Sequence, residues 1–130
     1  MTFPFWCLLV CCFLPYLLAG ASGYFKAKQF GTVDNNAPRA QTAALVGPGA
    51  RAHAAQQNAW EALPVFTAAV VVAHLAGADA RFSAIAAGTF LATRVLHPIF
   101  YIANIATARS LVFMVGLGCL IWLFALAARA

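Results

Sequence analysis

Two apolar stretches of this sequence are interrupted by polar side chains that can bind an anionic ligand. One more such side chain follows the second stretch. These candidate site residues are Arg51, Asn58, Glu61, Arg94, His97, Tyr101 and Arg109. Arginine binds carboxylates through paired hydrogen bonds, and a carboxylate such as Glu61 binds an ammonium group. Because the cations outnumber the single carboxylate, the residue types indicate a site for a bound anion.

Helical spacing gathers these residues on two faces. Asn58 follows Arg51 by seven residues and Glu61 lies three residues further on, so all three share one broad helix face. Arg94, His97 and Tyr101 are spaced i, i+3 and i+7, so they also share one helix face. An arginine at the centre of a membrane span costs about 2.5–3.5 kcal/mol on insertion scales, and such residues usually face a bundle interior.

The elements that must position these residues are membrane helices. The chain has 130 residues, of which 64% are hydrophobic and 8% charged, whereas soluble domains carry about 25% charged residues. Four apolar stretches of about 20 residues predict four spans, at about 3–25, 50–77, 82–104 and 110–128. We expect an all-α protein: one membrane domain over residues 1–130, folded as a four-helix bundle.

The remaining apolar features support this fold. The first stretch contains small residues after an apolar run, as a signal peptide does, but it lacks a positive N-terminal region and is long enough to span. We therefore expect a retained helix. The four cysteines lie in apolar stretches without metal-ligand spacing, so we expect small buried side chains and no metal site. Gly116 and Gly118 predict close contacts between helices.

The basic residues divide unevenly between the two ends of the predicted spans. One side carries Lys26, Lys28, Arg39, Arg51 and Arg109, whereas the other carries only Arg81 and Arg129. The positive-inside rule then predicts cytoplasmic first and third loops and both termini outside. The net charge of +5 is scattered without a basic run, so we expect no nucleic-acid partner. The high alanine content and the preference for arginine over lysine favour a bacterial inner membrane.

The estimated depth in the membrane is similar for the polar residues of the second and third spans. At 1.5 Å per residue, Glu61 lies about 5 Å inside the cytoplasmic boundary, Arg94 about 12 Å and His97 about 7 Å. Both groups therefore lie in one leaflet. A purely structural alternative is that Glu61 and Arg94 pair only to hold two helices together. That alternative leaves the other polar residues without a role.

These motifs resemble those of the MAPEG family, the membrane-associated proteins in eicosanoid and glutathione metabolism. The first is Asn58-x-x-Glu61-x-x-Pro64-x-Phe66, preceded by Arg51-Ala52-His53. The second is Arg94-x-x-His97-x-x-x-Tyr101, which looks like the corresponding stretch of microsomal prostaglandin E synthase. The segment DNNAPR at 34–39 is similar to a run in short bacterial members.

The resemblance implies a homotrimer with glutathione bound between subunits near the cytoplasmic surface. It implies glutathione binding by Arg51, Asn58, Glu61, Arg94, His97 and Tyr101, and a catalytic role for Arg109. Glutathione would serve as co-substrate, and its thiol would attack or reduce a lipophilic small molecule that arrives from the membrane lipids. The expected function is a glutathione-dependent transferase or peroxidase.

Two other functions stay open at this point. Related enzymes often have an arginine seven residues before the glutamate, where this chain has Ala54. Its absence favours a non-catalytic lipid-binding or accessory protein of the same family, unless Arg51 substitutes for it. A small transporter is disfavoured, because the polar groups cluster in one leaflet instead of continuing across the bilayer.

Overall fold

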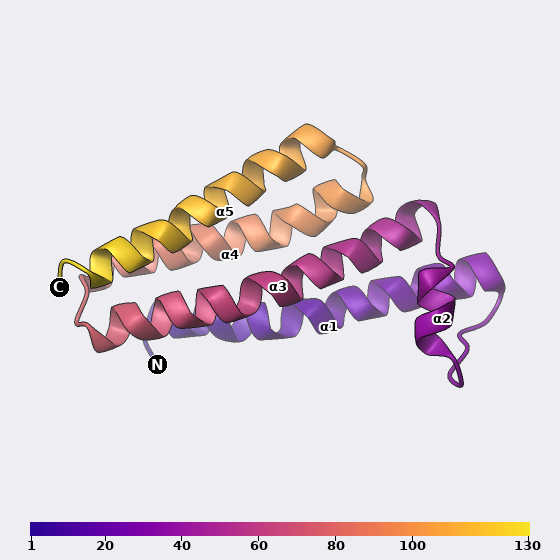
Figure 1. The fold of residues 1–130 in the computed structure, drawn as a ribbon, viewed down its shortest axis with the longest axis horizontal. Helices are drawn as coiled ribbons and strands as arrows, with labels where there is room; N and C mark the ends of the chain where they lie inside the picture. Colours follow the sequence, from indigo (N-terminus) through magenta and orange to yellow (C-terminus); the bar gives the residue numbers. More distant parts are fainter.

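The computed structural model describes residues 1–130 and is entirely helical, which confirms the predicted all-α class. Four long helices form an elongated bundle, and one short helix lies across the connection between the first two long ones (Figure 1). The helices are α1 (Phe3–Phe30), α2 (Pro38–Ala43), α3 (Gly47–Leu75), α4 (Ala80–Ile102) and α5 (Ala106–Ala127).

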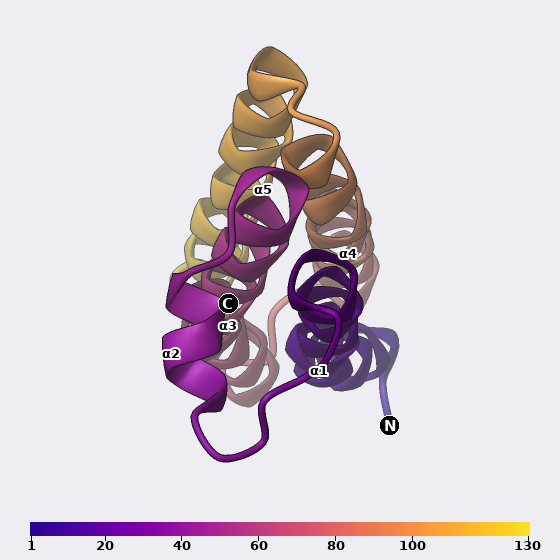
Figure 2. The ribbon, with the colours of Figure 1, turned by 90° about the vertical axis from the view of Figure 1, so that its right-hand side faces the viewer.

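The helices associate as two pairs, α1 with α3 and α4 with α5 (Figures 1 and 2). Both termini and the α3–α4 connection lie at one end of the bundle, and α2 and the α4–α5 connection lie toward the other end (Figure 1). Lys26, Arg51 and Arg109, which lie in the helical turns next to these connections, are therefore at the same end of the bundle, as the predicted order of four spans requires.

All four long helices are long and apolar enough to cross a membrane. Helix α1 has 28 residues and α3 has 29. At 1.5 Å per residue each is more than about 40 Å long, which exceeds the hydrocarbon core of about 30 Å. Because these two helices meet the α2 connection, their extra turns project at the end where the basic residues gather.

The connection after α1 is more ordered than the sequence predicted. We expected the first helix to end near residue 25 and a polar loop to follow. Instead α1 continues to Phe30 and stops at Gly31, which takes the left-handed conformation (φ 78°) that ends many helices. The segment expected to be a loop contains α2, which begins with Pro38 at its first position.

Side-chain hydrogen bonds hold this connection against α1. Lys26 Nζ donates to the carbonyl of Pro38 at 3.0 Å. The Gln29 side chain donates to the carbonyl of Ala44 and accepts from the amide of Val46. These bonds fix where α3 begins relative to α1. They therefore also fix the position of Asn58 and Glu61 along the bundle axis.

The short α3–α4 connection has strong local signals. Gly77, with φ 77°, allows its own amide and that of Ala78 to reach back to the carbonyls of His74 and Ala73 and close α3. Asp79 then caps α4 by accepting a hydrogen bond of 2.9 Å from the amide of Phe82. Helix α4 consequently begins two residues before the expected start of the third span.

The apolar core lies between the four long helices, on the side of the site toward the chain termini. Phe66 of α3 stacks on Phe90 of α4, with ring centroids 4.1 Å apart, and both side chains are fully buried. Three cysteines (Cys7, Cys11 and Cys119) are buried in this core and the fourth is half-buried, all as free thiols. Their predicted role as small buried side chains is confirmed. The core ends one helical turn before Arg94.

Candidate functional site

The candidate site begins with a hydrogen bond between α3 and α4. Arg94 Nη1 donates to Asn58 Oδ1 at 3.1 Å. Asn58 is half-buried and Arg94 is only 5% exposed, so a charged guanidinium lies inside the bundle. Two residues that the sequence placed on separate helix faces are therefore in direct contact.

The surroundings of Arg94 are mostly apolar. Its guanidinium carbon lies 5.3 Å from the centroid of the Phe90 ring and 5.8 Å from that of Phe113. Its Nε is buried and has no hydrogen-bond partner. Since a buried charged donor is normally fully paired, this guanidinium retains unused hydrogen-bonding capacity.

Gly116 of α5 makes room for this arginine. A Cβ atom at that position would lie 2.9 Å from Arg94 Nη2 and 2.9 Å from Thr93 Oγ1. A side chain there would therefore displace the guanidinium or the threonine. The predicted close contact is confirmed at Gly116, whereas a Cβ at Gly118 would meet nothing within 4 Å.

Glu61 shares a cavity with Arg94 but does not pair with it. The cavity measures about 220 Å³, and its wall includes Asn58, Glu61, Arg94 and Phe113. Glu61 is exposed and forms no hydrogen bond, and Arg94 donates to Asn58 instead. The structural alternative, a Glu61–Arg94 ion pair that holds the helices together, is therefore absent from this structure.

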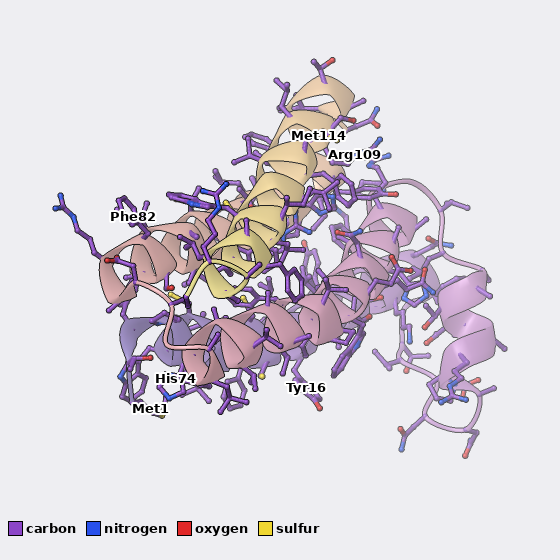
Figure 3. All side chains as sticks on the ribbon, turned by 60° about the vertical axis from the view of Figure 1, so that its left-hand side comes forward. Met1, Tyr16, His74, Phe82, Arg109 and Met114 are labelled. Atoms are coloured by element: carbon purple, nitrogen blue, oxygen red, sulfur yellow. The ribbon has the colours of Figure 1, made fainter.

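His97, Tyr101 and Arg109 form a second cluster one turn further along. The Arg109 guanidinium lies over the Tyr101 ring, 4.4 Å from its centroid. The His97 ring meets the Tyr101 ring edge-on at 5.5 Å and is itself 5% exposed. A hollow of about 330 Å³ opens beside this cluster, lined by His97, Arg109, Ser110, Phe113 and Met114; Figure 3 shows Arg109 and Met114 near the start of α5.

The tight α4–α5 turn brings Arg109 back to Tyr101. Asn104 adopts the left-handed conformation (φ 62°), and its amide donates to the carbonyl of Tyr101. The next amide, that of Ile105, donates to the carbonyl of Phe100. This pattern ends α4 abruptly and reverses the chain within a few residues. The expected third span ran to residue 104 and the fourth began at 110, so the sequence predicted a longer connection than the structure has.

Arg51 stands apart from the cavity that contains Glu61. Its Nε donates to the carbonyl of Ile102 at 3.1 Å, at the C-terminal end of α4. A cation is favourable there, because the last carbonyls of a helix are unpaired and carry partial negative charge. The structure therefore places Arg51 beside the Tyr101 end of the site, where its remaining guanidinium nitrogens form no hydrogen bond within the chain.

The structure thus arranges six of the seven candidate residues as two neighbouring groups with Phe113 between them, and Arg51 lies apart at the end of α4. Phe113 lines both cavities, and its ring centroid lies 6.4 Å from that of His97. The sequence reasoning did not select Phe113. It lies in the apolar part of α5 and carries no polar signal, so only the packing of α5 on α4 shows its position.

Comparison with known protein families gave one match. The family model of the MAPEG family matches residues 3–129, almost the whole chain. The chain belongs to the MAPEG family. It is accordingly a multi-pass membrane protein from a family of membrane glutathione-related enzymes. No curated protein and no solved structure matched the chain.

The residues present in this MAPEG protein have the chemistry that glutathione requires. Glutathione carries two carboxylates, an ammonium group and a thiol. The unpaired Arg94 Nε is a buried donor, and Arg51 and Arg109 supply two further cations at the same end of the bundle. Glu61 supplies an unpaired carboxylate on the cavity wall. The donor set therefore fits an anionic ligand with one positive group.

Proposed function

We propose that this protein is a membrane-bound, glutathione-dependent transferase or peroxidase that acts on hydrophobic electrophiles. The observation that carries the proposal is the buried Arg94 guanidinium. It is held by Asn58, has an unpaired Nε, and borders a cavity whose only acidic residue, Glu61, is not bonded to it. Such a charge is costly to bury without a partner, and a bound anion would provide one.

Each residue has a role that follows from its position. Glu61 would bind the ammonium of the γ-glutamyl group, and Arg94 would bind a carboxylate while Asn58 fixes its orientation. Arg51 lies at the end of α4, where its free guanidinium nitrogens would bind the second carboxylate. The rings of His97 and Tyr101 contact each other, and Tyr101 also contacts Arg109, so these two rings would form one wall of the glutathione site next to Arg109.

Arg109 is the residue we assign to catalysis. Glutathione supplies a thiol whose thiolate form attacks or reduces the electrophile. A guanidinium close to a thiol favours the thiolate, which is the nucleophilic form. The Arg109 guanidinium lies over the Tyr101 ring, and the hollow beside His97 would admit the second substrate.

The site would be completed by a neighbouring subunit in a homotrimer. Glu61 is exposed and the two cavities are open on one side, so a single chain does not enclose the ligand. Helix α3 also carries an open apolar groove beside Trp60, Pro64 and Ala68. We propose that a neighbouring subunit packs against this groove. The completed site would lie near the cytoplasmic surface of a bacterial inner membrane.

One feature favours a second function, a non-catalytic lipid-binding or accessory role. Ala54 occupies the position where related enzymes often carry an arginine, and Arg51 is partly committed to the carbonyl of Ile102. A protein of this kind would bind a lipophilic molecule without turning over glutathione.

Two measurements on the purified full-length protein separate these functions. Calorimetric titration with glutathione should show saturable binding, and cysteinylglycine, which lacks the γ-glutamyl group, should bind more weakly. Turnover is then followed with a chromogenic halonitrobenzene and with a hydrophobic hydroperoxide. Glutathione binding with turnover of either substrate supports the proposal. Absence of glutathione binding would contradict it, and binding without turnover of any electrophile would support the accessory role.

A further inference from the structure

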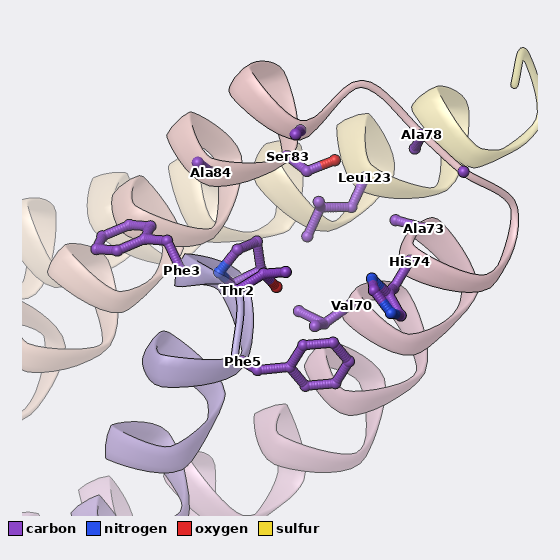
Figure 4. Close-up of a pocket in the computed structure, with 13 residues that line it drawn as sticks. Thr2, Phe3, Phe5, Val70, Ala73, His74, Ala78, Ser83, Ala84 and Leu123 are labelled. Carbon is purple, nitrogen blue, oxygen red and sulfur yellow. The ribbon is translucent and has the colours of Figure 1, made fainter.

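A further cavity lies at the opposite end of the bundle from the candidate glutathione site. It measures about 390 Å³ and is enclosed by the first residues of α1, the last turns of α3, the start of α4, and Leu123 of α5 (Figure 4). Figure 3 shows the separation, with His74 near the termini and Arg109 near the α4–α5 turn. The cavity therefore shares no residue with the candidate site.

The size and lining of this cavity are those of a small-molecule site. Its volume falls in the range of about 300–1,000 Å³ that is typical of ligand pockets. Eight of its 13 lining residues are hydrophobic, including Phe3, Phe5, Val70 and Leu123. Such walls favour an apolar ligand body, because burying apolar surface is the main source of affinity in such pockets.

Three polar side chains line the wall: Ser83 is buried without a hydrogen-bond partner, whereas Thr2 and His74 are exposed. The Ser83 side chain is only 7% exposed. Thr2 precedes α1 at the position where threonine usually caps a helix, yet its side chain makes no capping bond. His74 packs edge-on against the Phe5 ring at 5.1 Å and forms no side-chain hydrogen bond. In Figure 4, Ser83 and His74 lie on opposite sides of the cavity.

The lining also determines the charge of the ligand. No aspartate, glutamate, lysine or arginine side chain lines the cavity. A charged head group would be buried without a counter-ion, which is strongly unfavourable. Hydroxyls and an imidazole instead suit a neutral oxygen that donates or accepts a hydrogen bond.

From these observations we propose that the cavity is a binding site for an uncharged amphipathic molecule, with an apolar body and a hydroxyl or carbonyl head. The apolar body packs against Phe5, Val70 and Leu123, and the head reaches the buried, unpartnered hydroxyl of Ser83. The cavity is spatially separate from the candidate glutathione site, because the two lie at opposite ends of the bundle and share no lining residue.

Photolabelling of the full-length protein in lipid nanodiscs tests this proposal. The probe is a long-chain alcohol that carries a diazirine, and the labelled peptides are identified by mass spectrometry. We expect labelling concentrated in residues 2–5 and 70–84, with competition by hexadecanol and not by hexadecane. Labelling spread evenly over all lipid-facing helices, or equal competition by the alkane, would overturn the proposal.

Three variants make the test specific. Ser83→Ala removes the unpartnered hydroxyl and should lower labelling about three- to tenfold, the range expected for one lost hydrogen bond. Ser22→Ala is the matched control, since Ser22 is also buried without a partner but does not line the cavity. Ala84→Phe should fill the cavity and abolish the localised labelling. If Ala84→Phe fails to fold, the two serine variants decide: equal labelling in both would contradict a polar site at Ser83.

Discussion

Arg94 of α4 donates a hydrogen bond of 3.1 Å to Asn58 of α3, and this contact joins the two helices inside the bundle. Asn58→Ala would remove the partner of a guanidinium that is 5% exposed. We expect the free energy of unfolding to fall by about 1.5–3 kcal/mol, the range for hydrogen bonds to charged groups. Thermal unfolding in detergent without ligand measures this loss.

Gln57→Ala is the control for that variant, because Gln57 is exposed on the same helix and forms no side-chain hydrogen bond. It should leave the unfolding temperature nearly unchanged. Equal unfolding temperatures for the Asn58 and Gln57 variants would show that the Arg94–Asn58 bond does not stabilise the fold.

Gly116 and Gly118 provide a matched pair for the packing around Arg94. Gly116→Ala would put a methyl group 2.9 Å from Arg94 Nη2, so we expect a net destabilisation of about 1–3 kcal/mol from overpacking, and weaker glutathione binding. Gly118→Ala meets open space and should stabilise the helix by up to about 1 kcal/mol. Thermal unfolding and calorimetry check both variants, and an identical response of the two glycines would refute the packing argument.

Arg109 tests the catalytic part of the proposal. Arg109→Leu should lower kcat by about 100-fold, typical of removing one electrostatic stabiliser, with a small effect on glutathione affinity. Its activity should recover as the pH rises, since alkaline solution forms the thiolate without help from a guanidinium. Arg109→Lys keeps the charge and should retain more activity at neutral pH. A Leu variant with wild-type kcat would remove Arg109 from the mechanism.

The four long helices and most of the polar groupings were predictable, because they depend on local spacing, but Arg51 lies apart from Asn58 and Glu61, with which its spacing grouped it. An apolar run of about 20 residues specifies a span, and i, i+3 and i+7 positions share a face wherever a helix forms. The signals for the ends of helices were also present, as at Asp79 and Gly77, and they correct the boundaries by a few residues.

The contacts within the site were less predictable, because they depend on how α5 packs and where α4 stops. The sequence suggested Glu61 as a partner for Arg94, but the side-chain oxygen of Asn58 accepts the hydrogen bond instead. The left-handed Asn104 shortens the α4–α5 connection and brings Arg109 over Tyr101. Residue types alone do not define either of these three-dimensional relationships.

The proposed assembly gives a separate prediction. Because Glu61 is exposed and α3 carries an open apolar groove, we expect the purified protein in mild detergent to have three times the protomer mass. Native mass spectrometry or light scattering with detergent correction measures this directly. A dominant monomer would contradict a site that is completed by a neighbouring subunit.

In the proposed function, Glu61 contributes to glutathione binding and not to the stability of the bundle. Glu61→Gln keeps the size of the side chain but removes its charge. It should weaken glutathione binding by about 1–3 kcal/mol, the scale of a charge-assisted hydrogen bond. Because Glu61 is exposed and unpaired in the structure, the variant without ligand should unfold at the wild-type temperature.

The most direct test is therefore thermal unfolding of the wild-type protein and Glu61→Gln, each with and without glutathione. We predict that glutathione raises the unfolding temperature of the wild type, that this shift is lost or strongly reduced in the variant, and that both proteins unfold alike without ligand. A wild type that shows no glutathione-induced shift, or a variant that is already strongly destabilised without ligand, would contradict the proposed site.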